Sequence, residues 1–308
     1  KKNQILIYPH INMDGDALGS ATALCKALRD MGKECYILIE DDVPGNLRFL
    51  DKGYTTFDAD VIRKPELSIC VDCGDAGRFP KRKAKFDSAK KTICIDHHAT
   101  TTHYCDYNYV DSNSAATGEL IYELLREMGA VIDKEIGEAI FAAITTDTGN
   151  FQYSNTSKRS HEIMASLYDA GIDANRVSIE LYENQRIEKI RIKNKVLNTM
   201  SLICNGKGAI CYMTEEMLAE TGASGDETDG VVQELRSISS VEIAAFLKEI
   251  PGGKVKASLR SKRYANVAEI AADFGGGGHI RAAGCTMECT LGEAFDAIKM
   301  KMTDCLEK

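Results

Sequence analysis

The sequence predicts an α/β protein in which a larger N-terminal domain with a mostly parallel sheet is joined by a helix to a smaller α/β C-terminal domain. Short apolar runs of β-like residues alternate with helical patterns through the first half of the chain. This alternation is typical of a parallel sheet with helices on both faces. The chain has 308 residues and 44% hydrophobic content, which is enough for two separate cores.

The elements of the N-terminal domain, residues 1–185, follow one another as strand and helix. Apolar residues that recur at a spacing of three or four favour a helix, and a short apolar run between turn residues favours a strand. Ser114 stands where it can cap the helix that follows it. Strands are expected at residues 5–8, 35–39, 67–71 and 92–95, and helices at residues 18–31, 115–128 and 138–145.

The character of the sequence changes near residue 187. A charged helical segment, residues 186–200, is expected to connect the two domains. The C-terminal domain, residues 201–308, follows with strands and helices of its own. Its strands are expected at residues 208–213, 241–247 and 254–260, and its helices at residues 229–238, 267–274 and 291–306.

The composition excludes several classes of protein. A net charge of −8 and a pI of about 5.4 argue against a broad basic surface for long duplex nucleic acid. No apolar run is long enough to span a bilayer, and the first residues lack a secretory signal pattern. Eleven scattered cysteines are typical of reduced, buried thiols, so we expect a cytoplasmic protein. Cys70 and Cys73 form a CxxC inside a strand pattern, where we expect the two side chains to point to opposite faces.

Acidic residues and histidines stand where the predicted elements end. Because the carboxyl ends of parallel strands meet at one edge of a sheet, which is also where ligands bind, we expect these side chains to lie close together. They are His10, Asp14 and Asp16 after the first strand, Asp72 after the third, Asp96, His97 and His98 at the end of the fourth, and Asp147 after the helical segment.

This set of carboxylates and imidazoles predicts two divalent cations. Closely packed carboxylates repel one another, and cations remove that conflict. Carboxylate oxygens with imidazole nitrogens suit manganese best, with magnesium or cobalt as alternatives. A single Asp or His after a strand is usually a cap or turn residue, but the joint pattern favours a metal centre. We expect a curled loop in which Gly15 supplies the turn and Asp14 and Asp16 serve different metals.

The run Asp96-His97-His98, preceded by the spacing of His10, Asp14 and Asp16, carries a family resemblance. The chain resembles the DHH phosphoesterases over nearly its whole length. Within them it is similar to the short group with a DHH-associated C-terminal domain, the nano-RNases and 3′-phosphoadenosine-5′-phosphate (pAp) phosphatases. Met13 stands where the family usually has proline, which is expected to alter loop stiffness and not ligation. The matching stretches are HINMDGDALGS at 10–20, VDCGD at 71–75, DHH at 96–98, NSAATG at 113–118, TDTG at 146–149 and GGGGHIRAAG at 275–284.

The resemblance implies a role for each residue of the metal centre. His98 is expected to face the phosphate and, with Asp72, to act in catalysis, whereas Asp96 is expected to orient the histidines. Asp72 is implied to bridge the two ions. One ion is expected on His10, Asp14 and Asp72, and the other on Asp16, Asp72, His97 and Asp147.

The C-terminal domain is expected to hold the substrate. The glycine run at residues 275–278 exceeds what a helix C-cap needs and would let backbone N–H groups approach an anion, with His279 as a further donor. By the resemblance Arg260 reaches the same phosphate, and a solvated charge at a strand end is the alternative. The expected substrate-binding residues are Arg260, Gly276, Gly277, Gly278, His279 and Ser114.

We therefore expect a metal-dependent phosphoesterase that hydrolyses short oligoribonucleotides, dinucleotides included, or pAp to nucleoside monophosphates with a metal-activated water. A short substrate needs a local anion site and no long basic track, which agrees with the acidic net charge. The alternatives are a cyclic-dinucleotide phosphodiesterase, an inorganic pyrophosphatase or exopolyphosphatase, and a non-catalytic nucleotide sensor. Neither long duplex nucleic acid nor a membrane is an expected partner, and the oligomeric state, a homodimer included, stays open.

Overall fold

The computed structural model describes residues 3–307, and the chain divides into two compact units, Lys1–Asn184 and Gln185–Lys308. The helix expected between the domains is α7, Ile187–Asn198. It belongs to the second unit, because Ile192 and Val196 are buried in a hydrophobic cluster of that unit.

The first unit is built on a sheet in which every strand pairing is parallel, as the sequence predicts. The strand order is β3-β2-β1-β4-β5-β6. The chain moves outward from β1 in one direction and, after returning, outward from β4 in the other. The carboxyl ends of β1 and β4 therefore flank the point where an open α/β sheet binds ligands. The strands are β1 Gln4–Tyr8, β2 Glu34–Leu38, β3 Thr55–Thr56, β4 Leu67–Val71, β5 Thr92–Asp96 and β6 Tyr107–Val110.

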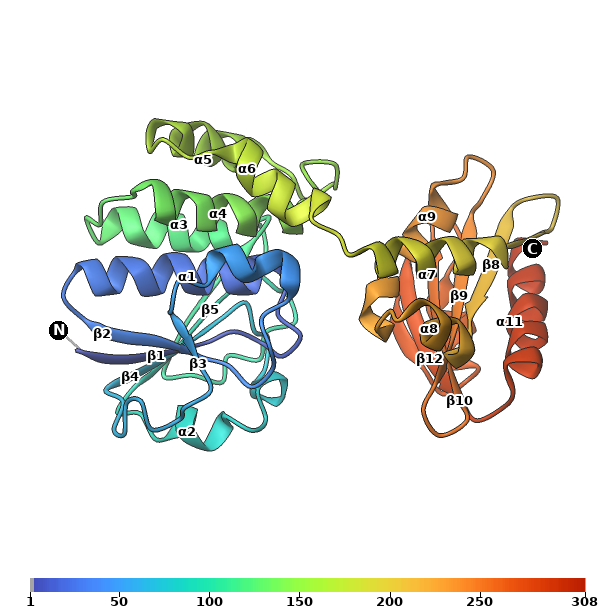
Figure 1. Ribbon diagram of the computed structural model, residues 1–308, viewed down its shortest axis with the longest axis horizontal. Coiled ribbons are helices and arrows are strands. Elements are labelled where there is room, and N and C mark those ends of the chain that lie inside the picture. Colours follow the sequence, from blue (N-terminus) through green and yellow to red (C-terminus); the bar gives the residue numbers. More distant parts are fainter. Residues whose placement is uncertain (1–2, 308) are drawn as a thin grey trace. The chain divides into compact units, whose positions relative to one another are not determined.

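Helices cover both faces of this sheet (Figure 1). Helix α1, Gly15–Asp30, lies on one face, and the short α2, Lys83–Asp87, lies on the other. Helices α3, Thr117–Glu127, and α4, Lys134–Asp147, pack on α1.

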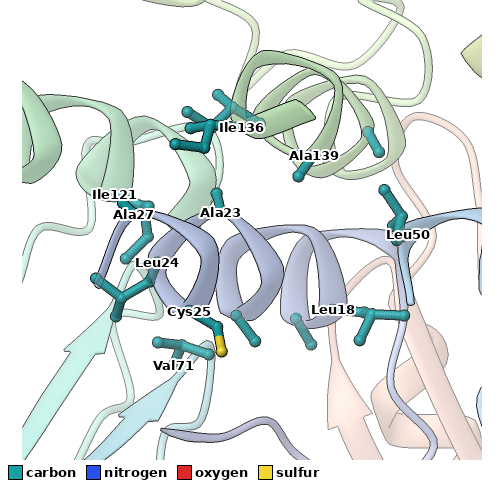
Figure 2. Close-up of a cluster of buried hydrophobic side chains, with 14 of the residues drawn as sticks. Leu18, Ala23, Leu24, Cys25, Ala27, Leu50, Val71, Ile121, Ile136 and Ala139 are labelled. Atoms are coloured by element: carbon teal, nitrogen blue, oxygen red, sulfur yellow. The ribbon is translucent and has the colours of Figure 1, made fainter. Parts of the chain in front are cut away.

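Helix α1 is buried on nearly all sides, although the sequence predicts an apolar stripe on one side only. The difference arises because α1 is enclosed between the sheet and the helices α3 and α4. Figure 2 shows Leu24 and Cys25 near Val71 of the sheet, while Ala23 faces the helices above. Alanines and glycines on the outward side let the neighbouring helices approach closely.

Two helix boundaries differ from the prediction. Ser114 does not cap α3, which begins at Thr117 with Ala116 at the N-cap and no side-chain cap hydrogen bond. The apolar segment predicted at 138–145 is the centre of a longer helix, which Asp133 caps by accepting a hydrogen bond from the N–H of Ile136. Several elements of the first unit were not predicted: the strands β3 and β6, the helix α2, η1 Gly45–Leu50, η2 Ala76–Arg78, α5 Lys158–Asp169, α6 Ala174–Ser178 and the π-helical turn η3 Ile179–Glu183.

The CxxC cysteines also differ from the prediction, because Cys70 and Cys73 lie in the same hydrophobic cluster. Asp72 between them has a left-handed φ of +54°, which ends the strand alternation and turns Cys73 back toward Cys70. The hydroxyl of Tyr104 donates to the Cys70 sulfur and to the Cys73 carbonyl, both at 2.9 Å. All eleven cysteines are free thiols.

The second unit holds a mixed sheet of order β11-β12-β10-β9-β8-β7, in which β8 and β9 are parallel and the other pairings antiparallel. Its strands are β7 Ser201–Ile203, β8 Gly208–Met213, β9 Ile243–Ile250, β10 Lys254–Ser261, β11 Gly277–His279 and β12 Ala282–Met287. The prediction of a smaller α/β domain is confirmed, although β7, β11 and β12 were not predicted.

Helices pack on both faces of this second sheet. Helices α10, Val267–Ala272, and α11, Leu291–Leu306, share one hydrophobic cluster with it. Helices α7 and α9, Val231–Ser237, share the cluster on the other face (Figure 1). The remaining helical elements are α8, Glu215–Thr221, and η4, Gly225–Thr228. Within residues 3–307, no helix has both the length and the apolar character to cross a membrane.

Candidate metal centre

The loop between β1 and α1 brings three of the predicted side chains to the edge of the first sheet. Asp14 is the N-cap of α1, and its carboxylate accepts hydrogen bonds from the N–H groups of Asp16 and Ala17 at 3.1 and 3.0 Å. The turn comes from Asn12, which has a φ of +52°. Gly15 is instead required by close packing, because a Cβ there would lie less than 3 Å from the side chain of Thr146 in α4.

Asp72 lies at the centre of the site, directly after β4, and only 2% of it is exposed. Its carboxylate oxygens are 3.5 Å from His10 Nε2, 3.6 Å from His97 Nε2 and 3.7 Å from His98 Nδ1. Burial acts to raise the pKa of Asp72, but the hydrogen bond to His10 and the nearby imidazoles hold that pKa below its ordinary value. Asp72 is therefore an ionised carboxylate shared by several imidazoles.

Backbone carbonyls orient the two buried imidazoles. His10 Nδ1 lies 2.7 Å from the carbonyl oxygen of Ile11, and His97 Nδ1 lies 3.2 Å from that of Ser114. A carbonyl accepts only, so each Nδ1 donates a proton there, and Nε2 is the ring nitrogen that faces the acidic residues. His97 Nε2 lies 3.4 Å from Asp147 and 3.8 Å from Asp16. A histidine fixed in this way is a ready metal ligand.

Asp16 is fully enclosed in the first turn of α1 and contacts the start of α3. Its oxygens accept hydrogen bonds from the N–H groups of Thr117 and Gly118 at 2.7 and 2.8 Å. Burial, followed by the charges of Asp72 and Asp147, raises its pKa well above the ordinary value. Burial also raises the pKa of Asp147 to about 6, aided by Asp72 and Asp14 and opposed by His97. These carboxylates conflict with one another unless cations lie among them.

Asp96 has a different task, because both of its oxygens are used inside the protein and none of it is exposed. It accepts hydrogen bonds from His98 Nδ1 at 2.8 Å, from the N–H of His97 at 3.0 Å and from the hydroxyl of Thr101. The hydrogen bond to Asp96 raises the pKa of His98 to about 9, against the effect of burial. His98 is thus a partly exposed histidine whose Nδ1 is held between Asp96 and Asp72.

Three groups of side chains in residues 3–307 place ligand atoms within 4.8 Å of one another. Asp72 and His97 each belong to two of them, so neighbouring sites would share ligands. Asp14 and Asp16 fall into different groups, in agreement with the expectation that they serve different ions. The donor set of buried, mutually repelling carboxylates and oriented imidazoles fits two divalent cations. The groups are His10, Asp14 and Asp72; Asp16, His97 and Asp147; and Asp72, His97 and His98.

Thr117 was not predicted as a residue of the site, and Ser114 contacts it through its backbone. The Thr117 hydroxyl donates to Asp72 at 3.0 Å, while its N–H binds Asp16, so this one residue fixes two carboxylates. The Ser114 hydroxyl is buried and donates to the Ala116 carbonyl and the Glu119 carboxylate, both at 2.9 Å. It is held inside the protein, and the contribution of Ser114 to the site is the carbonyl that orients His97.

In the second unit the glycine run is part of the sheet. The N–H groups of Gly275 and Gly276 donate to the carbonyls of Ala272 and Ala271, so these two cannot bind an anion. Gly277–His279 form the exposed edge strand β11. A Cβ on Gly276 or Gly278 would lie less than 3 Å from backbone atoms of β12, so close backbone approach requires glycine at both positions.

Arg260 and His279 lie in one row across this sheet. Arg260 pairs with Ala282 of β12, and Ala282 pairs with His279, which places the two side chains on the same face. A cavity of about 380 Å³ on that face is lined by three basic residues, Lys248, Lys256 and Arg260, together with Asp229 and uncharged residues. Burial and the charge of Arg236 lower the pKa of Arg260. Among residues 3–307 no carboxylate oxygen lies within 4.0 Å of the Arg260 guanidinium. The guanidinium is therefore not neutralised by an ion pair with these residues, which leaves its charge available for an anion.

Comparison with known proteins gives two family matches and several relatives. Residues 4–144 match the DHH family, N-terminal domain, and residues 205–308 match the DHHA1 domain. The bifunctional oligoribonuclease and PAP phosphatase NrnA of Thermus thermophilus is 30% identical, over 96% of this chain and 87% of that protein. The protein of the same name from Bacillus subtilis is 26% identical, over 92% of this chain and 89% of its own length.

Solved structures agree with these matches. An exopolyphosphatase-related protein from Bacteroides fragilis is similar with a TM-score of 0.91 and 25% identity, covering 100% of this chain and 95% of that chain. RecJ of Thermus thermophilus in complex with Mn²⁺ has a TM-score of 0.55 and 15% identity, covering 97% of this chain and 52% of that chain, so it shares the fold alone. With both domains matched in order and a relative at 30% identity over nearly its whole length, the chain belongs to the DHH family, as the resemblance implied.

Proposed function

We propose that this protein hydrolyses short oligoribonucleotides and pAp to nucleoside monophosphates at the metal centre of the first unit. The observation that carries the proposal is the arrangement around Asp72, a buried and ionised carboxylate that faces three imidazoles and belongs to two of the three ligand groups. The relatives named bifunctional oligoribonuclease and PAP phosphatase support the substrate class.

The proposed ligands follow from the groups described above. His10, Asp14 and Asp72 would hold one divalent cation, and Asp16, Asp72, His97 and Asp147 the other, with manganese as the preferred ion. When bound, two such ions would supply an acidified water as the nucleophile and stabilise charge on the phosphoryl oxygens. The carboxylate of Asp72 would serve both sites.

His98 is the proposed proton donor to the leaving oxygen. Its hydrogen bond to Asp96 keeps the imidazole protonated and holds the ring beside Asp72. Its side chain is 41% exposed, so a bound substrate can reach it. A positioned histidine of this kind contributes roughly 10²- to 10⁴-fold to a hydrolysis rate.

The second unit is proposed to hold a distal phosphate or the far nucleotide. Arg260 offers a guanidinium without a carboxylate partner among the described residues, and His279 lies in the same row of the sheet. Gly277 and Gly278 bring an exposed strand edge beside them, whereas Gly276 serves packing. This narrows the predicted substrate-binding set to Arg260, Gly277, Gly278 and His279.

A cyclic-dinucleotide phosphodiesterase remains the second candidate, because the same metal centre and anion-binding face suit that substrate. A pyrophosphatase is less favoured, since the basic groups of the second unit suit a longer nucleotide. All six predicted metal-ligand residues lie in the three ligand groups, which argues against a non-catalytic sensor.

The test is a manganese-supplemented assay of the purified protein with pAp, an RNA dinucleotide, a cyclic dinucleotide and pyrophosphate. Chromatography of the products is expected to show nucleoside monophosphates from the first two substrates. Exclusive turnover of pyrophosphate, or of the cyclic dinucleotide, would overturn the proposal in favour of that alternative.

A further inference from the structure

The segment that follows Asp147 has an unusual backbone. Gly149, Asn150 and Phe151 are consecutive left-handed residues with φ of +55°, +56° and +64°. A non-glycine residue is rarely stable in this conformation unless the surrounding structure holds it in place. Strain of this kind concentrates at functional sites, and here it lies within four residues of a proposed metal ligand.

Hydrogen bonds and ring stacking hold the segment in this shape. The N–H of Asn150 donates to the Thr145 carbonyl at 2.7 Å, and the N–H of Phe151 donates to the Thr148 hydroxyl at 3.1 Å. The Phe151 ring stacks on His161 of α5, with ring centroids 5.3 Å apart. The reversal of the chain is therefore a rigid feature and not a loose loop.

Asn155 ties the far end of the segment back to the metal centre. Its side-chain amide donates to the carbonyl of Asp147 at 3.1 Å and to the carbonyl of Ala115 at 3.0 Å. Ala115 directly follows Ser114, whose carbonyl orients His97. Both ends of the segment are thus attached to backbone that positions proposed ligands.

The result of this folding is the placement of Tyr153. Its N–H donates to the Thr148 carbonyl at 3.0 Å, and its ring lies on Gly149, where a Cβ would come within 3 Å of the ring atoms. One side of the ring therefore packs on backbone two residues beyond Asp147. The side chain as a whole is still 55% exposed. A large aromatic side chain that is held on backbone close in the chain to a proposed metal ligand, and left open to solvent, is suited to stacking on a flat ligand group.

We propose that Tyr153 is the stacking surface for the nucleobase of the nucleotide whose phosphate lies at the metal centre. This inference rests on the proposed function, because it assumes a nucleotide substrate. Stacking of a base on an aromatic side chain contributes about 1–3 kcal/mol and is tolerant of sequence, because every base has a π-face. Tyr153 would then select nucleotides over phosphoesters that lack a base, while leaving the choice of base open.

The test compares substrates with and without a base in the full-length, manganese-loaded protein. For Tyr153→Ala, KM for pAp and for an RNA dinucleotide is expected to rise roughly 5- to 150-fold. The effect on ribose 3,5-bisphosphate, which has no base, is expected to stay below about twofold. Tyr153→Phe keeps the ring and should behave like the wild type. Tyr107→Ala is the matched control, because Tyr107 is 59% exposed at the amino end of β6, away from the metal centre.

Two outcomes would overturn the inference: an unchanged KM for both nucleotide substrates, or an equal loss on the base-free substrate. Titration calorimetry with AMP and ribose 5-phosphate separates this inference from the proposed function, because it needs no turnover. Tyr153→Ala should weaken AMP binding and spare ribose 5-phosphate even if the wild type hydrolyses neither pAp nor dinucleotides. Equal affinities of wild type and variant for AMP would reject the stacking role by itself.

Discussion

Asp72, Asp16 and Asp96 show how the same side chain takes different roles within one site. Asp72 faces imidazoles and stays ionised, whereas Asp16 is buried among other carboxylates and holds a proton more tightly. The oxygens of Asp96 accept hydrogen bonds from the two histidines and Thr101. Surroundings, and not residue type, therefore decide which carboxylate bridges, which competes for a cation and which orients its neighbours.

Asp72→Asn should remove metal and activity together. The amide cannot supply the second anionic oxygen that two sites share, so both lose a ligand. We expect a loss of metal content by elemental analysis and a fall in kcat of at least about 10²-fold. Glu127→Gln, which changes an exposed carboxylate at the end of α3 outside the three ligand groups, is the control. Turnover retained in Asp72→Asn would reject the bridging role.

Asp147→Asn should stabilise the metal-free protein and remove much of the stabilisation that manganese gives. The pKa of Asp147 is about 6 in the folded state, against 3.8 for an ordinary aspartate, so the folded protein binds this proton more tightly than the unfolded chain does. The cost of ionising it is absent below about pH 4, grows as the pH rises from about 4 to 6 and is fully present above that range. In chelator at pH 7 the variant should gain about 1–2 kcal/mol after screening by solvent. Thermal unfolding at pH 4 and pH 7, with and without manganese, measures this, and a gain at pH 4 alone would contradict it.

The proposed ligands could be predicted from the sequence because each stands at the end of a recognisable element. The residues that orient them could not. Thr117 reaches Asp72 and Asp16 across more than 40 residues of chain, and the Ser114 carbonyl acts through its backbone, which carries no side-chain signal. Such contacts exist only once α3 is placed against α1.

At the scale of elements, the distance between α1 and α4 determines how far apart the proposed metal ligands lie. Asp14 and Asp16 stand at the N-cap and in the first turn of α1, and Asp147 is the last residue of α4. Gly19 makes this spacing short: a Cβ there would lie 2.5 Å from the Ala139 carbonyl oxygen. The sequence predicts the helix α1. It does not predict that α1 is enclosed by the sheet and by α3 and α4, because alanine and glycine on the outward side give no apolar stripe. The left-handed turn after Asp147 could not be predicted from the sequence either, because Asn150 and Phe151 do not by themselves indicate a positive φ.

Gly19→Ala should separate α1 from α4 and lower stability by about 1–3 kcal/mol, as overpacking usually does. Manganese affinity should fall in parallel, because the ligands on the two helices move apart. Gly45→Ala is the matched control, since a Cβ at Gly45 meets no atom within 4 Å and its φ is ordinary. Chemical denaturation and manganese titration of both variants check this. Equal stability of the two variants would show that the helices can adjust at no cost.

At the scale of the whole molecule, our proposal assigns chemistry to the first unit and substrate recognition to the second. The parallel sheet of the first unit brings the proposed ligands to its switch point, and the alternation of strands and helices predicts such a sheet. The second unit was predicted only in part, because β11 consists of two glycines and a histidine, a composition that gives no strand signal. Its role as an edge strand follows from pairing with β12, and the sequence does not reveal this pairing.

His279→Ala should weaken nucleotide substrates far more than a small phosphodiester without a distal phosphate. Loss of one hydrogen bond to a charged phosphate costs about 1.5–3 kcal/mol, which corresponds to roughly 10- to 150-fold in kcat/KM. Bis(p-nitrophenyl) phosphate, which has no second phosphate, should be cleaved at close to the wild-type rate. Lys299→Ala is the control, because Lys299 is exposed on α11, which packs on the other face of the sheet from Arg260. Equal losses on pAp and on the small diester would indicate that His279 supports the folding of the second unit. A selective loss on nucleotide substrates would indicate that His279 binds the distal phosphate and that catalysis depends on the first unit.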